Sequence, residues 1–397
     1  MITVGSPAYW RVTLALSLGA FMVFANIYLP QPLLPTFAAQ FGISALQAGW
    51  ILTLTTLTLG LSLLFYGALS DALGRKPLMV MTLAAVTLIT LLLSFADSYA
   101  SLLWLRALQG LFLAGLPAIA IAYLGEELQP QAMVAAVGVY IAANTLGGIG
   151  GRLIGGYLGE WLGWEQAFLW MGLISLVLLV LFILLLPRSV HFEPAPVRPA
   201  LMLRDLRGHL RNPVLLAVYF IGGINFLVFV NQYSYIVFVL ADEPYSLSAR
   251  FLGLLFLTYL SGTFASMLSG RLARYWSQPS CMMLGILLFM TGSLLTLQGS
   301  LPAIISGFLI NSFGFFLAHA MASSWVSRNA QRARATASAL YLVFYYLGAS
   351  SGGFYLEPFW LWRGWEGVVA GSLLALLLTL SLSGWLFRVG RQHTAQA

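Results

Sequence analysis

The stretch Gly67-Ala-Leu-Ser-Asp71-Ala-Leu-Gly-Arg75-Lys-Pro-Leu-Met79 lies between two long apolar runs, which predict helices over residues 47–69 and 77–95. Each run is close to the ~20 apolar residues that cross a bilayer as one helix. The glycines of the stretch let two helices approach each other closely, and its charges suit a membrane surface. The stretch therefore predicts two membrane-spanning helices joined by a tight, charged loop.

The composition of the whole chain agrees with this interpretation. Of its 397 residues, 60% are hydrophobic and only 8% are charged, and the mean hydropathy is +0.89. Soluble domains carry about 25% charged residues, so a soluble protein and a disordered one are both excluded. Twelve spanning helices would use ~240 residues, which fits this length. The single cysteine, Cys281, excludes an internal disulfide and a cysteine metal cluster.

Apolar segments recur along the chain with short breaks, and they predict an all-α membrane protein of twelve transmembrane helices. The expected helices cover residues 12–36, 47–69, 77–95, 100–123, 133–158, 164–186, 213–240, 249–270, 280–297, 302–324, 335–358 and 365–387. One long polar stretch divides them into two groups of six. We therefore expect an N-terminal half over 1–187, a cytoplasmic linker over 188–212 and a C-terminal half over 213–397.

The linker contains a predicted amphipathic helix. Three leucines share one helical face and three arginines lie beside them: Leu203, Leu206 and Leu210, and Arg204, Arg207 and Arg211. This pattern is typical of a helix that lies on the anionic inner leaflet. A solvated tether that only needs to be polar is the alternative.

The basic residues predict the orientation of the chain, because Lys and Arg concentrate on the cytoplasmic side. A cytoplasmic N-terminus leaves only Arg250 and Arg363 outside. The inner face then carries Arg11, Arg75, Lys76, Arg188, Arg198, Arg204, Arg207, Arg211, Arg271, Arg274, Arg328, Arg332, Arg334, Arg388 and Arg391. Both termini are therefore expected inside. Membrane topology explains the net charge of +7, and no nucleic-acid partner is expected.

The two halves are related in sequence, since the same residues recur after a shift of 201 positions. The pairs include Tyr140 with Tyr341, Gly147 with Gly348, Gly151 with Gly352, Trp161 with Trp362, Trp164 with Trp365 and Glu165 with Glu366. Parallel repeats of this kind occur in transporters whose two halves rock around a site near the middle of the bilayer.

With these features the chain resembles the major facilitator superfamily over essentially its full length. It is most similar to the bacterial drug/proton antiporter branch, of the inner-membrane multidrug efflux type. Gly67, Asp71, Gly74, Arg75 and Lys76 match the loop motif of the superfamily. The resemblance implies a gating role, in which Asp71 meets the N-terminus of the eleventh helix, near residues 335–338, in one of two conformations. A plain turn with helix-end charges is the alternative.

The fourth helix carries Arg106, Gln109 and Gly110, which resemble a second motif of the family. A charge inside an apolar run normally faces a partner or a water-filled cavity. The resemblance implies that Arg106 takes part in proton coupling. The alternative is an arginine that reaches the nearby periplasmic interface or pairs with Asp97.

The fifth helix has the glycine spacing of the antiporter motif, but Arg152 occupies the position of its proline. Gly147, Gly151 and Gly155 form one close-packing ridge, expected to face the other half, and Gly348 and Gly352 repeat it. Two interpretations of Arg152 remain open. It binds an anionic or strongly polar substrate, or it holds the halves together through Glu357 or a helix-end carbonyl.

Candidate substrate and proton sites come from polar residues at membrane depth. His319 in the tenth helix has an ordinary pKa near ~6.5 and is a proton-coupling candidate, or else a hydrogen-bonded packing residue. Asn26, Asn225 and Asn311 lie on helices that line the cavity in this family. Each is a candidate substrate contact, or a residue that only joins helices.

Together these observations predict a secondary active transporter of the bacterial inner membrane that works by alternating access. We expect proton-coupled efflux of a small neutral or anionic organic compound. The acidic residues that would bind a bulky cation are confined to loops and helix ends. The alternatives are uptake of a sugar, amino acid or organic acid by proton symport, and a non-transporting sensor or lipid-handling protein. Enzymatic, cofactor and metal motifs are not found, and a monomer in the lipid bilayer is expected.

Overall fold

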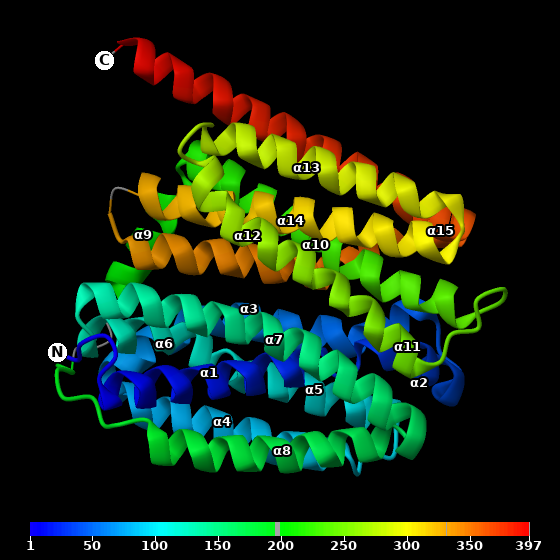
Figure 1. Ribbon diagram of the computed structural model, residues 1–397, viewed down its shortest axis with the longest axis horizontal. Coiled ribbons are helices and arrows are strands. Elements are labelled where there is room, and N and C mark those ends of the chain that lie inside the picture. Colours follow the sequence, from blue (N-terminus) through cyan, green and yellow to red (C-terminus); the bar gives the residue numbers. More distant parts are fainter. Residues whose placement is uncertain (195–198, 331, 397) are drawn as a thin grey trace. The chain divides into compact units, whose positions relative to one another are not determined.

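The structure is a computed structural model that describes residues 1–194, 199–330 and 332–396, without the side chains of 199 and 390–396 (Figure 1). The described residues are helical apart from turns, short loops and an isolated bridge between Ile2 and Leu128. Two expected inner-face charges, Arg198 and the side chain of Arg391, lie outside the described residues. The prediction of an all-α membrane protein is confirmed.

The elements follow one another along the chain with short connections. They are α1 (Pro7–Tyr28), η1 (Gln31–Leu33), α2 (Leu34–Phe41), α3 (Ala45–Leu73), α4 (Arg75–Leu93), α5 (Tyr99–Leu113), α6 (Gly115–Glu127), α7 (Pro130–Leu162), α8 (Trp164–Leu185), α9 (Pro199–Leu210), α10 (Pro213–Ala241), α11 (Ala249–Leu254), η2 (Leu255–Thr258), α12 (Tyr259–Leu272), α13 (Gln278–Leu295), η3 (Thr296–Gln298), α14 (Leu301–Asn329) and α15 (Arg334–Gln396).

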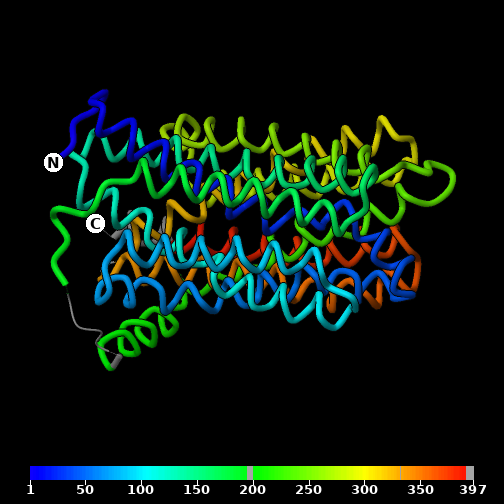
Figure 2. The backbone as a smooth tube through the Cα atoms, turned by 90° about the horizontal axis from the view of Figure 1, so that it is seen from below, coloured from blue at the N-terminus to red at the C-terminus, as the bar shows by residue number. Residues whose placement is uncertain are grey.

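The described residues contain eleven helical stretches that are long and apolar enough to cross a membrane. The last of them, Arg334–Val389, bends at Arg363 and Gly364, where the backbone leaves helical geometry. Dividing it there gives the twelve predicted spans. The helices of each unit run alongside one another (Figure 2).

Three of the predicted spans are interrupted. The first divides into α1, η1 and α2, the fourth into α5 and α6 at Ala114, and the eighth into α11, η2 and α12. The first break has a clear cause in Pro30 and Pro32. Each lacks a backbone N–H and therefore removes a helical hydrogen bond.

The chain divides into two compact units. Unit 1 comprises Met1–Arg198 and Leu247–Phe256, and unit 2 comprises Pro199–Ser246 and Leu257–Ala397. The first part of the expected linker therefore groups with unit 1, and α9 groups with unit 2. The segment 247–256, which includes α11, also groups with unit 1, where it packs on α7.

Within unit 1, the glycine ridge of α7 packs against α1. A β-carbon on Gly147 would lie 2.6 Å from the Phe21 carbonyl oxygen, and one on Gly151 would lie 2.6 Å from Ala25 Cα. Gly155 meets Leu29 in the same way. The expectation that this ridge faces the other half was wrong, because the close partner is the first helix of the same unit.

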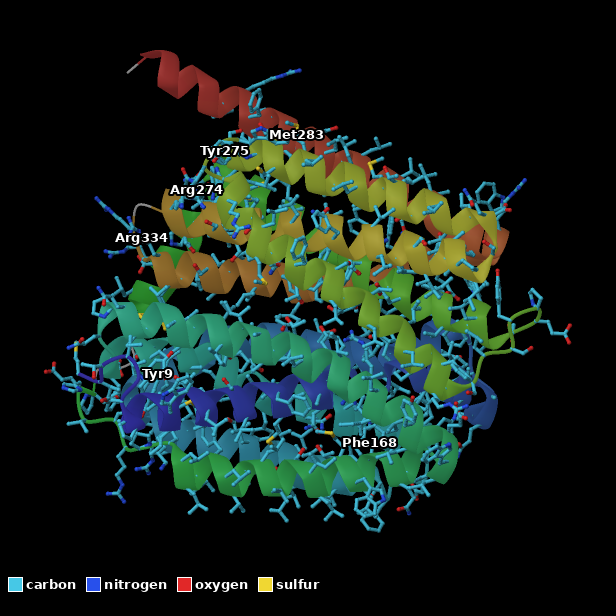
Figure 3. All side chains as sticks on the ribbon, in the orientation of Figure 1. Tyr9, Phe168, Arg274, Tyr275, Met283 and Arg334 are labelled. Carbon is cyan, nitrogen blue, oxygen red and sulfur yellow. The ribbon has the colours of Figure 1, made fainter. Side chains whose placement is uncertain are left out.

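Unit 2 repeats this arrangement with α10 and α15. Gly348 lies against the backbone of Gly223, and a β-carbon on Gly352 would lie 2.6 Å from the Leu227 carbonyl oxygen. Arg274, just after α12, and Arg334, at the start of α15, lie at the same end of this unit (Figure 3). The sequence assigned both arginines to one membrane face.

Candidate functional site

Arg106 is fully buried in unit 1 and binds the end of α1. Its Nη1 donates to the Asn26 carbonyl oxygen at 2.9 Å, and its Nη2 donates to that of Ile27 at 2.7 Å. Its Nε donates to the Ile51 carbonyl oxygen on α3 at 3.2 Å. Within the described residues the guanidinium therefore binds backbone carbonyls rather than Asp97, and it does not extend to the membrane surface.

The sequence of the first span explains why carbonyls are available there. The last carbonyls of a helix have no intrahelical donor. Because Pro30 has no N–H, it cannot serve the Asn26 carbonyl four residues earlier. The guanidinium supplies that donor, and its positive charge also suits the negative end of the helix dipole. Arg106, a residue of α5, thus caps the C-terminus of α1.

A polar network continues from this cap across four helices of unit 1. Asn26 on α1 donates to Ser175 Oγ on α8 at 2.9 Å and accepts from Thr90 Oγ1 on α4 at 2.6 Å. Gln109 on α5 donates to Thr90 Oγ1 at 2.8 Å and accepts from Arg106. All these side chains are buried. Asn26 therefore lies at the centre of a network that joins helices.

Arg152 is also buried in unit 1, at 1% exposure. Its Nε donates to Gln31 Oε1 at 2.7 Å, and its Nη1 donates to the Gly148 carbonyl oxygen at 2.8 Å. The guanidinium carbon lies 4.0 Å from the ring centre of Tyr28 and 4.4 Å from that of Phe256. Two aromatic rings and the η1 turn thus surround this charge. A contact with Glu357, which belongs to unit 2, stays a prediction.

The loop motif forms an ion-pair cluster at the junction of α3 and α4. Arg75 is 8% exposed and binds Asp71 at 2.5 Å and Glu126, at the end of α6, at 2.7 Å.

The other residues of the loop motif have separate surroundings. Gly74 has a φ of +98°, a conformation that favours glycine. Lys76 donates to the carbonyls of Ile183 and Leu186 at the end of α8. A β-carbon on Gly67, in contrast, would meet nothing within 4 Å.

Glu127 is a buried carboxylate that the sequence reasoning missed. It is 3% exposed and accepts from the backbone N–H groups of Val190 and His191 at 2.7 and 3.0 Å. His191 Nδ1 lies 3.1 Å from the same carboxylate. The start of the linker is therefore held against the end of α6. No sequence signal distinguishes Glu127 from the neighbouring Glu126.

In unit 2, Asn225 and Asn311 belong to separate polar groups. Asn225 accepts from Thr379 Oγ1 at 2.9 Å. Asn311 Nδ2 donates to Gln232 Oε1 at 2.7 Å and to Ser293 Oγ at 3.2 Å. Asn311 Oδ1 is buried and has no hydrogen-bond partner among the described residues. The sequence identified these asparagines but not their threonine and serine partners, because hydroxyl residues are common in apolar helices.

His319 lies in an aromatic cluster of unit 2. Its Nδ1 is 2.9 Å from Tyr341 Oη, and its ring centre is 4.7 Å from that of Tyr345 and 5.9 Å from that of Phe315. Phe226 stacks on Tyr345 with ring centres 3.6 Å apart. The titratable ring is thus placed among aromatic side chains from α10, α14 and α15.

Comparison with known proteins agrees with the fold. The chain is 39% identical over 384 residues to YybF of Bacillus subtilis, an uncharacterized MFS-type transporter. The alignment covers 97% of this chain and 95% of that protein. The chain is 38% identical over 384 residues to the inner membrane transport protein YnfM of Escherichia coli, with 95% and 90% of the two chains covered.

A solved structure shares the fold. It is a bacterial homologue of the human lysosomal transporter Spinster, in an inward-facing, unoccupied conformation, and it matches with a TM-score of 0.74 at 17% identity over 98% of both chains. The profile of the Major Facilitator Superfamily matches residues 16–353. With its multi-pass helical architecture and its transporter relatives, the chain is a membrane transporter that belongs to the major facilitator superfamily.

Proposed function

We propose that this transporter exports a small neutral or anionic organic compound across the bacterial inner membrane in exchange for protons, by alternating access. The observation that carries the proposal is the distribution of charge. Arg106 and Arg152 are buried within spanning helices of unit 1, whereas every acidic residue lies at a helix end, in a loop, on α9 or close to the bend of α15. A bulky cation would find no buried carboxylate at mid-helix, and an anion would find guanidinium groups.

Export and proton coupling rest on the helical motifs. The glycine spacing of α7 is similar to that of drug/proton antiporters, and Arg106 stands in the second family motif. His319 and Arg106 are the candidate proton-coupling groups, since both are ionisable and lie within spanning helices. Asn26, Arg152, Asn225 and Asn311 are the proposed substrate contacts. Because each is bonded to a neighbour, substrate would exchange for one of these hydrogen bonds.

The proposed orientation places both termini in the cytoplasm and treats the monomer as the functional unit. Asp71 and Arg75 then belong to a cytoplasmic gate, in which the 2.5 Å ion pair holds the loop in shape. The α9 helix supports an inner-leaflet location, because Leu203 is 68% exposed and the side chain of the neighbouring Arg204 is 76% exposed. Leucines would enter the lipid while arginines meet its anionic headgroups.

The test is the internal pH of proteoliposomes when anionic, neutral and cationic compounds are added in turn. We expect proton flux opposite to substrate flux for a neutral or anionic compound, and loss of this flux in His319→Gln or Arg106→Gln. Arg204→Gln, on the exposed face of α9, is the matched control and should keep the flux.

Each other outcome contradicts a defined part of the proposal. Flux of protons and substrate in the same direction would make the protein an uptake symporter. A clear preference for lipophilic cations would contradict the substrate class. If none of the compounds produces a proton flux, and Asp71→Asn leaves the phenotype of cells unchanged, a sensor or lipid-handling protein would be favoured.

A further inference from the structure

The aromatic cluster around His319 combines three buried rings with two partly exposed side chains. Phe226, Phe315 and Tyr341 are 4%, 1% and 1% exposed. His319 and Tyr345, in contrast, are both partly exposed. The stack of Phe226 on Tyr345, at 3.6 Å and 11° between the ring planes, fixes the orientation of Tyr345 from behind. The result is a rigid aromatic surface that ends in an imidazole and a phenol.

The hydrogen bond between His319 and Tyr341 fixes the orientation of the imidazole ring in this surface. Its Nδ1 is engaged by Tyr341 Oη, while its Nε2 has no hydrogen-bond partner among the described residues, and the residue as a whole is partly exposed. An imidazole has two ring nitrogens that both make hydrogen bonds. With one nitrogen fixed by Tyr341, the other keeps a set direction and one hydrogen bond to offer a ligand.

We propose that His319 and Tyr345 form the specificity site for a planar aromatic ring that carries a polar substituent. The ring packs against the exposed parts of the two side chains, and the substituent bonds His319 Nε2. Aromatic pairs prefer offset or edge-to-face contacts with ring centres about 4.5–7 Å apart, and such contacts add affinity beyond that of the buried area. Binding sites of this kind combine aromatic walls with a few directed polar groups. This inference rests on the proposed transport function and narrows its substrate class.

The experiment compares ring pairs that differ only in aromaticity, using the full-length protein in nanodiscs. Benzoate is matched with cyclohexanecarboxylate, and benzamide with cyclohexanecarboxamide. We expect the aromatic member of at least one pair to bind about two- to tenfold more tightly. Tyr345→Leu should remove this preference and Tyr345→Phe should keep it. His319→Leu should weaken both members of a pair, because it removes the shared hydrogen bond. Phe264→Leu, an exposed ring elsewhere in unit 2, is the control.

The outcomes separate this inference from the transport proposal. Equal binding within both pairs, or no binding of either aromatic compound, would overturn the aromatic site even if the protein transports a saturated compound. A ring preference that survives in Tyr345→Leu would also overturn it. Ring-selective binding without any proton-linked transport would contradict the transport proposal and leave the site standing. The comparison of the ring pairs on the unmodified protein does not depend on whether the variants fold.

Discussion

Arg152 on α7 donates a 2.7 Å hydrogen bond to Gln31 in the η1 turn, so a buried arginine is fixed to the break in the first span. Tyr28 and Phe256 enclose the same guanidinium. The family motif has a proline at the position of Arg152, and a proline there would bend α7. In this chain a charged, planar side chain occupies the position and joins α7 to the first span.

This arrangement predicts that charge alone does not satisfy the position. Arg152→Lys keeps the charge but loses the planar group between two rings, and a desolvated cation–π contact contributes about 2 kcal/mol. We expect a clear fall in the unfolding temperature of the purified protein. Arg204→Lys on the exposed face of α9 should leave it unchanged. Equal unfolding temperatures for the two variants would show that the enclosing rings do not stabilise Arg152.

The network of Asn26 predicts a difference between two threonines of α4. Both threonines bond a carbonyl oxygen of their own helix, Thr87 that of Leu83 and Thr90 that of Val86. Thr90 Oγ1 in addition links Asn26 and Gln109. Thr90→Val removes the link and leaves buried polar groups with a lost partner, at a cost of about 1–3 kcal/mol.

Thr87→Val is the matched control, because it is the same substitution at a buried site one helical turn away. Thermal unfolding followed by tryptophan fluorescence compares the two variants. A larger loss in Thr87→Val would argue against the network as a stabilising element.

The α1–α7 interface predicts opposite effects of one substitution at two glycines of α7. Gly151→Ala places a β-carbon against the backbone of Ala25, so the two helices must separate. Gly138→Ala meets nothing within 4 Å and should gain up to about 1 kcal/mol of helix propensity. We expect less folded protein in the membrane for the first variant and an unchanged or higher amount for the second. Equal yields would contradict the close packing.

The cluster around Arg75 predicts that its two carboxylates replace one another. Asp71→Asn or Glu126→Gln alone leaves Arg75 one acidic partner, and each should cost at most about 1 kcal/mol, because Asp71 and Glu126 are partly exposed. The double variant leaves a buried guanidinium without either carboxylate, which should cost about 3–5 kcal/mol.

A double-mutant cycle of unfolding temperatures measures this coupling. Asp97→Asn is the control, because the Asp97 carboxylate lies outside this cluster and accepts a hydrogen bond from Ser101 near the start of α5. Strictly additive effects would show that the two carboxylates act independently of each other.

Much of the fold could be predicted because the bilayer sets the length of each apolar helix. Two further features could be predicted because they are local sequence patterns. These are the charged stretch at Asp71 and Arg75 and the glycines of α7. The break at Ala114 lies three residues before Pro117, whose missing N–H leaves the Leu113 carbonyl without its helical donor. No proline lies within residues 249–272, so the sequence does not mark the break of the eighth span. Pro30 and Pro32 mark the first break in the sequence, because neither can donate a helical hydrogen bond.

The site was predictable as residue types and less so as contacts. The sequence shows that Arg106 is inside a helix, but its partners are backbone carbonyls, which any residue carries. Thr90 and Ser175 give no sequence signal for their part in the network, because only the packing of α1, α4 and α8 brings them to Asn26. Glu127 was missed for a similar reason, since it binds backbone groups of the linker.

The glycine contacts between α1 and α7, and between α10 and α15, bear on how this gene tolerates mutation. Any amino-acid change that a single nucleotide can make in a glycine codon adds at least a β-carbon. At Gly147, Gly151 and Gly348 that atom would fall within 3 Å of the backbone of the neighbouring helix. Every missense change at these positions should therefore be deleterious. In a saturation screen for function we expect only glycine to be tolerated there.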